Sequence, residues 1–368
     1  MKQDRKAWVR LVVFAVLFVG LTLAGVWYAV SRSGFGVAQL EDFQELPWWT
    51  KAGVAGFALA ILGTDMWRLV MVGRAVGVRI GFGAALDATI ANNFFSWITP
   101  GAALGEPATI YMLGRRGVPW DAAALIAFGK TATSVALVFG LAFLFLFLGL
   151  GPELHWAVMA PFVSGGTVVA GMVGVFVVGA IWPEPVKAWL RRKEVGWLAR
   201  WPWRRPSLGR GLSKTVETTC QTVDRLVAFR AGGFKGGLTI LIGHMLYYAA
   251  YAGLFMTIAA GLGATDLRGL LPVAVIYQTF TYSVPTPGGA GLSEGVAEVF
   301  FGGYLPPAKA VLTVLLFRGT TIYLHIVMGL VYLPIVGGMR EIVERGKVQA
   351  VSSEGVEDGP ADGTDAEG

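Results

Sequence analysis

Six apolar runs, each long enough to cross a lipid bilayer, dominate this sequence. A helix needs about 20 apolar residues to span the hydrocarbon core of a membrane. Charged residues make up only 15% of the chain, against about 25% in a typical soluble domain. The sequence therefore predicts an all-α integral membrane protein with six full transmembrane helices. The expected spans are residues 11–30, 52–72, 120–150, 156–182, 237–262 and 308–336.

Two further apolar stretches, at about residues 82–113 and 270–304, are broken near their middles. Thr99-Pro100-Gly101 interrupts the first, and a run of proline and glycine at 285–291 interrupts the second. Proline removes a backbone donor and glycine loosens a helix. Such a break survives at membrane depth only inside protein or beside a water-filled cavity. We therefore expect two re-entrant helical hairpins.

The basic residues predict which side of the membrane each loop faces. With a cytoplasmic N-terminus, 23 of the 30 Lys and Arg residues fall in cytoplasmic segments, four in outside loops and three within apolar segments. This strong bias predicts cytoplasmic N- and C-termini in the cytoplasmic (inner) membrane, with hairpins that enter from opposite sides. The expected regions are a basic N-terminus at 1–10, a membrane domain at 11–336 with a basic cytoplasmic loop at 183–235, and a largely disordered acidic cytoplasmic tail at 337–368.

The two hairpins are followed by the same residue types at the same spacing. Adding 188 to the residue number takes Glu106 to Glu294, Pro119 to Pro307 and Lys130 to Arg318. The helices that flank the two hairpins are expected to run in opposite senses. These halves are therefore predicted to be inverted-topology repeats, the arrangement of secondary transporters whose substrate site lies at the repeat interface.

Charged side chains inside the apolar segments are the candidates for function. A charge at the bilayer centre is costly, so such residues are expected to face the protein interior and to pair. We predict two pairs, Glu106 with Lys130 and Glu294 with Arg318. We also expect Asp65 and Arg68 to satisfy each other, because residues three apart share a helix face. The three histidines are left out of the predicted site.

Two interpretations of the pairs are open. They are either static clamps that hold each hairpin, or a site in which Arg318 and Lys130 bind an anionic headgroup through their positive charges. The candidate substrate-binding residues are Arg318, Glu294, Lys130, Glu106, Asn93, Gly288, Gly289 and Gly101. The candidate ion or proton carriers are Glu106, Glu294 and Glu298.

The motifs around the two breaks resemble those of a known membrane family. They are Asn93, Thr99-Pro100-Gly101 and Gly105-Glu106 in the first half, and the 285–291 run, Glu294 and Phe317-Arg318 in the second. Together they resemble the flippase-like membrane region of bacterial lysylphosphatidylglycerol synthases, over about residues 11–336. The resemblance implies transfer of a lipid between leaflets, with headgroup contact at Arg318 and Glu294. No soluble synthase domain follows the last apolar run, so synthase activity is not expected.

The favoured function is a flippase-like transporter that moves an anionic phospholipid or a lipid-linked phosphate, such as a polyprenyl-linked substrate, through a polar cavity between the hairpins. The alternatives are a noncatalytic membrane partner of a lipid- or glycan-modifying enzyme, and a membrane-embedded lipid-phosphate transferase. The sequence has no recognisable catalytic constellation, nucleotide-binding motif or metal-ligand spacing. We therefore expect neither enzyme activity nor a metal or cofactor. Membrane lipids are the expected partners, nucleic acid is not, and homo-oligomerisation is left open.

Overall fold

A computed structural model describes residues 20, 22–34, 36–152, 156–200, 216–217, 219–225, 233–284 and 286–337. Several predicted regions lie wholly or partly outside these residues. They are the N-terminus at 1–10, the first half of the helix predicted at 11–30, much of the loop at 183–235 and nearly all of the tail at 337–368.

Every regular element in the described part of the chain is a helix. The labelled elements are α2 (Val37–Gln44), α3 (Trp48–Ala75), α4 (Phe82–Ile98), η1 (Pro100–Ala102), α5 (Gly105–Arg115), α6 (Trp120–Phe147), α7 (Trp156–Ile181), α8 (Pro183–Arg200), α10 (Gly233–Gly261), α11 (Leu267–Ser283), η2 (Pro287–Gly289), α12 (Leu292–Gly295), α13 (Ala297–Phe301), α14 (Pro307–Arg318), the π-helical turn η3 (Gly319–Tyr323) and α15 (Leu324–Ile335). A further helix precedes α2 and is described over residues 22–33. The predicted helical class is therefore confirmed.

Five described helices are long and apolar enough to cross a membrane. They are Trp48–Ala75, Trp120–Phe147, Val158–Ile181, Gly236–Gly261 and Pro307–Ile335. These correspond to five of the six predicted spans. The last of them joins α14, η3 and α15 into one continuous helix. The sixth predicted span begins among residues that the structure does not describe.

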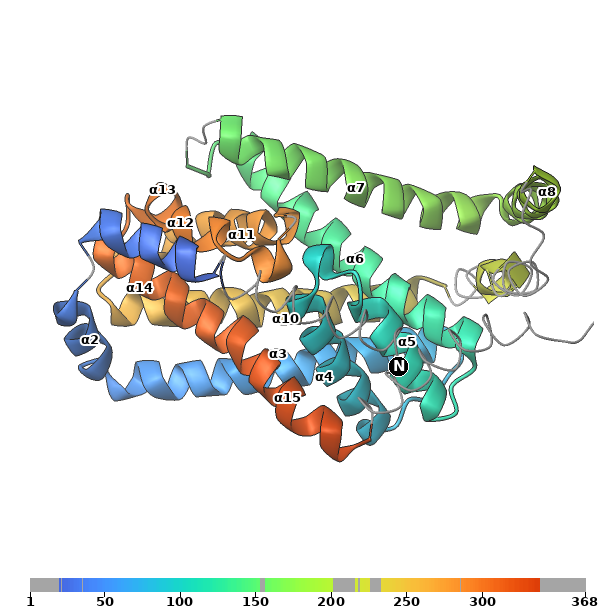
Figure 1. Cartoon of the computed structure of the whole chain (residues 1–368), viewed down its shortest axis with the longest axis horizontal. Helices are drawn as coiled ribbons and strands as arrows, with labels where there is room; N and C mark the ends of the chain where they lie inside the picture. Colours follow the sequence, from blue (N-terminus) through green and yellow to red (C-terminus); the bar gives the residue numbers. More distant parts are fainter. Residues whose placement is uncertain are drawn as a thin grey trace, which may run out of the picture.

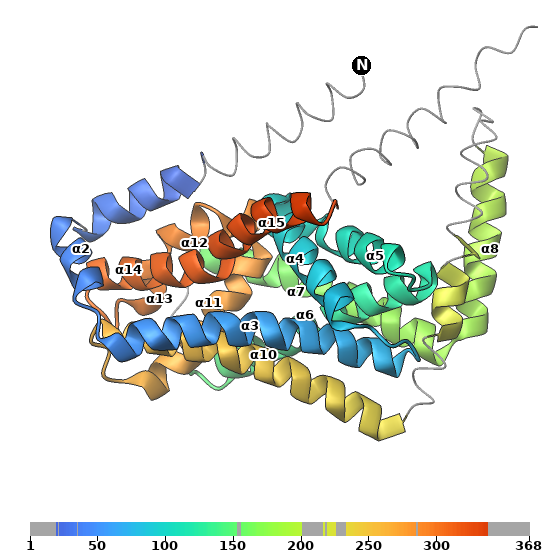
Figure 2. The same cartoon turned by 90° about the horizontal axis from the view of Figure 1, so that it is seen from below.

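Helices α3 and α10 lie side by side along the long axis of the molecule (Figures 1 and 2). Small residues allow this close approach. A Cβ atom at Gly253 would lie 2.5 Å from the ring of Phe57, and one at Gly261 would lie 2.5 Å from Oγ1 of Thr50. Helices in a membrane associate largely through such close packing, because lipid tails are as apolar as the side chains. The two broken segments pack against this pair, the first through α4 on α3 and the second through α11 on α10.

Both broken segments fold back on themselves as helical hairpins. In the first, α4 packs against α5, and in the second, α11 packs against α13. The first hairpin occupies the right half of the molecule in Figure 1 and the second the left half, and their tips η1 and η2 touch near the centre. The rings of Trp97 and Tyr282 stack across this junction, with centroids 6.2 Å apart. The chain thus brings two breaks, almost 190 residues apart in sequence, to one place.

Helix α7 runs along the upper edge of the bundle in Figure 1, where it packs on α6 and α11, and α8 turns away across its end (Figure 2). Lys187 of α8 forms ion pairs with Glu184, at 2.6 Å, and with Asp224, at 2.7 Å. The hydrogen bonds that this ammonium donates to Asp224 and Glu184 raise the pKa of Lys187. The side chains of Arg191, Arg192 and Lys193 are exposed.

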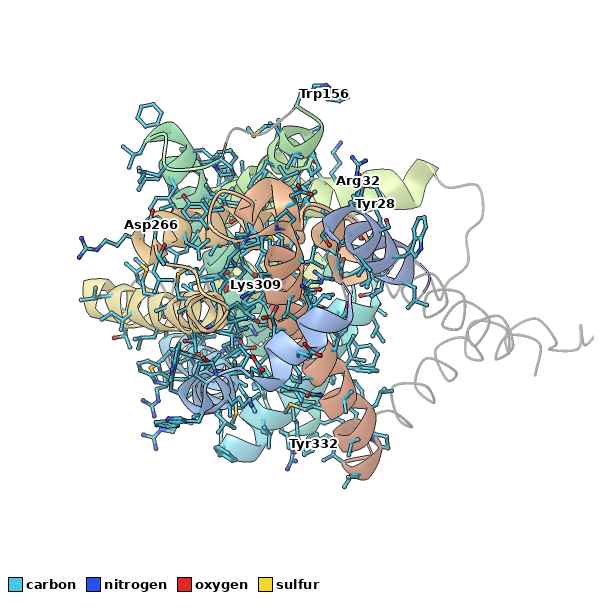
Figure 3. The ribbon with its side chains drawn as sticks, turned by 90° about the vertical axis from the view of Figure 1, so that its left-hand side faces the viewer. Tyr28, Arg32, Trp156, Asp266, Lys309 and Tyr332 are labelled. Carbon is cyan, nitrogen blue, oxygen red and sulfur yellow. The ribbon has the colours of Figure 1, made fainter. Side chains whose placement is uncertain are left out.

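The ends of the bundle differ in charge. Figure 3 views the end that carries Arg32, Asp266 and Lys309, where few basic residues lie. At the opposite end, α3 and α5 terminate with basic residues in their last turns, Arg74 and Arg115, and α8 adds its exposed cluster. The loops that the structure describes therefore lie in the same two groups that the distribution of basic residues predicts.

Candidate functional site

The two breaks have the same backbone geometry. Gly101 has φ 58° and ψ 25°, and Gly288 has φ 57° and ψ 16°. The next residue also has positive φ in both turns, 56° at Ala102 and 69° at Gly289. The turns therefore correspond at a spacing of 187, one residue less than the spacing of the charged residues that follow. This one-residue difference explains why Pro100 and Pro287 do not match when the sequence is shifted by 188.

Ala102 is the only described residue other than glycine with positive φ. A side chain in the left-handed region costs about 1–2 kcal/mol. Ala102→Gly should therefore raise the stability of the protein by about 1 kcal/mol, measured as a higher midpoint of thermal unfolding in detergent micelles. Ala103→Gly is the matched control and should lower the midpoint slightly, because Ala103 has no positive φ to relieve. A destabilised Ala102→Gly variant would contradict the assigned turn.

The charged cluster at the second break is centred on Glu294 and Arg318, as predicted. Nε of Arg318 lies 2.7 Å from Oε1 of Glu294, and both side chains are at most 1% exposed. Arg318 also donates from Nη2 to the carbonyl oxygen of Gly288, at 2.9 Å. Glu294 accepts hydrogen bonds from the backbone N–H of Gly291, at 2.9 Å, and from the hydroxyl of Tyr323, at 3.1 Å. This pair therefore connects α12, the break and the helix that follows.

The predicted pairing at the first break is wrong. Lys130 forms its ion pair with Asp65, at 3.0 Å, and among the described residues Glu106 has no ion pair with it. Asp65 accepts from Arg68 as well, at 2.6 Å, so the expected Asp65–Arg68 pair is confirmed but is shared with Lys130. The reason is packing, because α3 contacts α6 directly and places Asp65 beside Lys130. The first cluster consists of Asp65, Arg68 and Lys130.

Other predicted site residues surround the two clusters at different depths. Asn93 donates from its amide to Oδ2 of Asp65, at 3.3 Å, so it belongs to the first cluster. Glu106 is half-buried and accepts from the hydroxyl of Thr131, at 2.7 Å. Glu298 is exposed on α13, one turn beyond Glu294, and forms no part of either cluster.

Sequence reasoning missed several polar neighbours of the first cluster. The guanidinium of Arg68 donates to Oγ of Ser134, at 2.6 Å, and its central carbon lies 3.4 Å from the centroid of the Tyr247 ring. The ring of His244 is buried between two carbonyl oxygens, those of Ile240 at 2.8 Å and of Lys130 at 3.1 Å. Only the packing of α10 on α3 and α6 brings these residues together, so no local motif could have indicated them.

A groove with about 360 Å³ of free space, part of it open to the outside, lies between α6, α10, α11 and α14. Its lining is almost wholly apolar or aromatic and includes Tyr251, Phe255, Gln278 and Phe317. Phe317 directly precedes Arg318, and the hydroxyl of Tyr251 accepts from that of Tyr247, at 3.2 Å. The groove therefore lies beside residues that contact or adjoin both clusters.

The five charged side chains of the two clusters are each at most 4% exposed. A buried charge must be paired and hydrogen-bonded to be tolerated. In this arrangement the charges form two separate buried clusters, and none of the five side chains lines an open chamber.

The long apolar helices and the buried ion pairs between them define an integral membrane protein. The chain belongs to the family described as lysylphosphatidylglycerol synthase TM region, whose profile matches residues 8–329. This family is membrane-embedded and linked to lipid modification or lipid flipping. The match covers the described helices up to the middle of α15 and confirms the resemblance seen in the motifs. No curated protein matches the chain.

Proposed function

We propose that this protein is a flippase-like transporter that moves an anionic phospholipid or a lipid-linked phosphate between the leaflets of the cytoplasmic membrane. The observation that supports this most is the contact of two glycine-containing breaks, from hairpins at opposite ends of the bundle, between two buried clusters of charge. Broken helices that meet near the midplane are the usual site of substrate binding in transporters with inverted repeats. We therefore interpret the hairpins as re-entrant, and the two halves as inverted repeats.

The proposed orientation places the basic end of the bundle, with α8, in the cytoplasm. On this assignment the α4–α5 hairpin enters from the cytoplasm and the α11–α13 hairpin from outside. The closed contact between η1 and η2 is then one state of a cycle, and a polar path opens when the hairpins separate. Acyl chains stay in the bilayer while the headgroup passes between the clusters.

Leaflet exchange of a labelled lipid tests this function. The protein is reconstituted in liposomes that contain fluorescent phosphatidylglycerol, and dithionite is added to quench the probe in the outer leaflet. Without exchange, half of the fluorescence remains, because dithionite does not reach the lipid of the inner leaflet. With wild-type protein the fluorescence should fall well below this half. Arg318→Ala should abolish this exchange, whereas Arg268→Ala, a change of an exposed residue on α11, should not.

The alternatives predict other outcomes of the same assay. A noncatalytic partner of a lipid- or glycan-modifying enzyme would leave the inner-leaflet signal protected, with wild-type protein and with both variants. A lipid-phosphate transferase would change the chemical identity of the labelled lipid, which thin-layer chromatography of the extracted lipids detects. Exchange that is equal in liposomes with wild-type protein and with Arg318→Ala would reject the proposed role of Arg318.

A further inference from the structure

The two charged clusters differ in net charge. Glu294 and Arg318 balance each other. In the first cluster, two cations, Arg68 and Lys130, share one carboxylate, that of Asp65, and both bond to the same oxygen, Oδ1. With their ordinary charges, the first cluster has an excess of one positive charge.

This excess lies where water cannot screen it. The side chains of Asp65, Arg68 and Lys130 are 1%, 3% and 4% exposed. The neighbouring polar groups are neutral: the amide of Asn93 and the hydroxyl of Ser134. An uncompensated charge in a protein interior is strongly unfavourable unless an opposite charge joins it. The first cluster is therefore short of one anion.

A second observation also indicates an absent acceptor. Nε of Arg68 is buried and has no hydrogen-bond partner in the described structure, although the other two nitrogens of the guanidinium bond to Ser134 and Asp65. Nη1 of Arg318 is also without such a partner, so the excess charge is what distinguishes the first cluster. A buried donor without an acceptor costs about 1–3 kcal/mol. Guanidinium and ammonium groups together are the usual ligands of a phosphate group.

From these observations we infer that Arg68 and Lys130 form an anion site that takes a phosphate group, in addition to the cluster at Arg318. The inference rests on the proposed function for the source of the phosphate, which is the headgroup of an anionic lipid. It assigns unequal roles to the two halves: the first cluster gains a neutralising charge when the headgroup arrives, whereas the pair of Glu294 and Arg318 must open to contact it.

Among the described acidic groups on the helices next to this cluster, Asp87 pairs with Arg116 and Asp121 pairs with Arg225. Glu106 is the one left that could supply the missing charge. It is half-buried on α5 and bonds to Thr131, the residue after Lys130. If its carboxylate partly neutralises the excess, it competes with the bound phosphate. Glu106→Gln should then strengthen anion binding, not weaken it.

Changing the charge of the cluster in both directions tests the inference. The full-length protein in detergent is titrated with short-chain phosphatidylglycerol and with short-chain phosphatidylcholine of the same acyl chains, and binding is measured by calorimetry. Wild-type protein should prefer phosphatidylglycerol by at least tenfold. Lys130→Met removes the excess charge and should lower this preference at least tenfold. Asp65→Asn raises the excess and should increase the preference.

Two controls separate electrostatics from misfolding. Lys309→Met makes the same chemical change on α14, where Lys309 is partly exposed and 3.5 Å from Asp42, and should leave the preference unchanged. Thermal unfolding of each variant shows that it is folded. Disruption of the fold would lower the preference in both variants, and it cannot give effects of opposite sign. A lower preference in both Lys130→Met and Asp65→Asn would therefore overturn the inference. An unchanged preference in both variants would also overturn it.

Two further arms identify the source of the phosphate and separate this inference from the proposed function. Competition by inorganic phosphate at millimolar concentration would assign the site to soluble phosphate, whereas competition by lipid alone would assign it to a headgroup. If wild-type protein exchanges lipid but its preference does not follow the charge of the cluster, the inference fails and the function stands. If the preference follows the charge without lipid exchange, the site is supported and the transport function fails.

Discussion

Arg318→Ala should lower the free energy of unfolding by about 3–5 kcal/mol, because it leaves the carboxylate of Glu294 buried without a counter-ion. The variant also loses the hydrogen bond to the carbonyl of Gly288, which holds the second break. The measurement is the midpoint of thermal unfolding in detergent micelles, compared with wild type. Lys309→Ala, on the same helix, is the control and should cost no more than about 1 kcal/mol, since its ion pair is partly exposed.

A double variant distinguishes a structural clamp from a transport site. Arg318→Met combined with Glu294→Gln removes both charges, and the glutamine can still accept from the N–H of Gly291. It should recover most of the stability that Arg318→Ala loses, because neutral groups need no counter-ion. If the pair is only a clamp, lipid exchange should recover with stability. If Arg318 contacts the headgroup, the protein should be stable and exchange should stay absent.

Gly25→Ala should separate the N-terminal helix from the second break. A Cβ atom at Gly25 would lie 2.2 Å from Cα of Gly291, and a backbone atom cannot move aside as the end of a side chain can. Overpacking of this kind costs about 1–3 kcal/mol. Gly20→Ala is the matched control on the same stretch of chain, with no atom within 4 Å of the added Cβ. It should not destabilise the protein, since alanine favours helix more than glycine does.

Cysteine crosslinking locates the effect of Gly25→Ala. In a Cys220→Ser background, Tyr28→Cys and Gly295→Cys should be joined efficiently by a short bifunctional thiol crosslinker, because a Cβ at Gly295 would lie 3.4 Å from the Tyr28 ring. The yield should fall with Gly25→Ala and not with Gly20→Ala. Equal yields and equal unfolding midpoints in the two variants would show that the N-terminal helix does not pack on the break.

The sequence is informative wherever the physical signal is local. Hydropathy identifies the spans because a run of about 20 apolar residues matches the thickness of the hydrocarbon core. The breaks are visible as Pro100-Gly101 and Pro287-Gly288. The pair of Glu294 and Arg318 was predictable because few charges lie in the apolar segments and these two follow the same break. Asp65 and Arg68 were predictable from helix periodicity.

The prediction fails where a contact depends on how helices pack. Lys130 was assigned to Glu106 because the pair copies the spacing of Glu294 and Arg318 in the other half. Its true partner, Asp65, lies 65 residues earlier on α3, and nothing in the local pattern indicates that α3 would pack on α6 at that depth. The two turns share the same backbone geometry, but the charged residues beside them pair differently in the two halves.

The π-helical turn η3 decides which way the second cluster faces. In a regular α-helix, residues five apart point about 140° away from each other, because each residue adds about 100°. Arg318 and Tyr323 are five apart, and yet both contact Oε1 of Glu294. A wider turn closes that angle, since a π-turn needs one extra residue to complete its circuit. The wider turn therefore orients the phenol of Tyr323 toward the same carboxylate that the guanidinium of Arg318 contacts, so that both groups bind Glu294 from one helix.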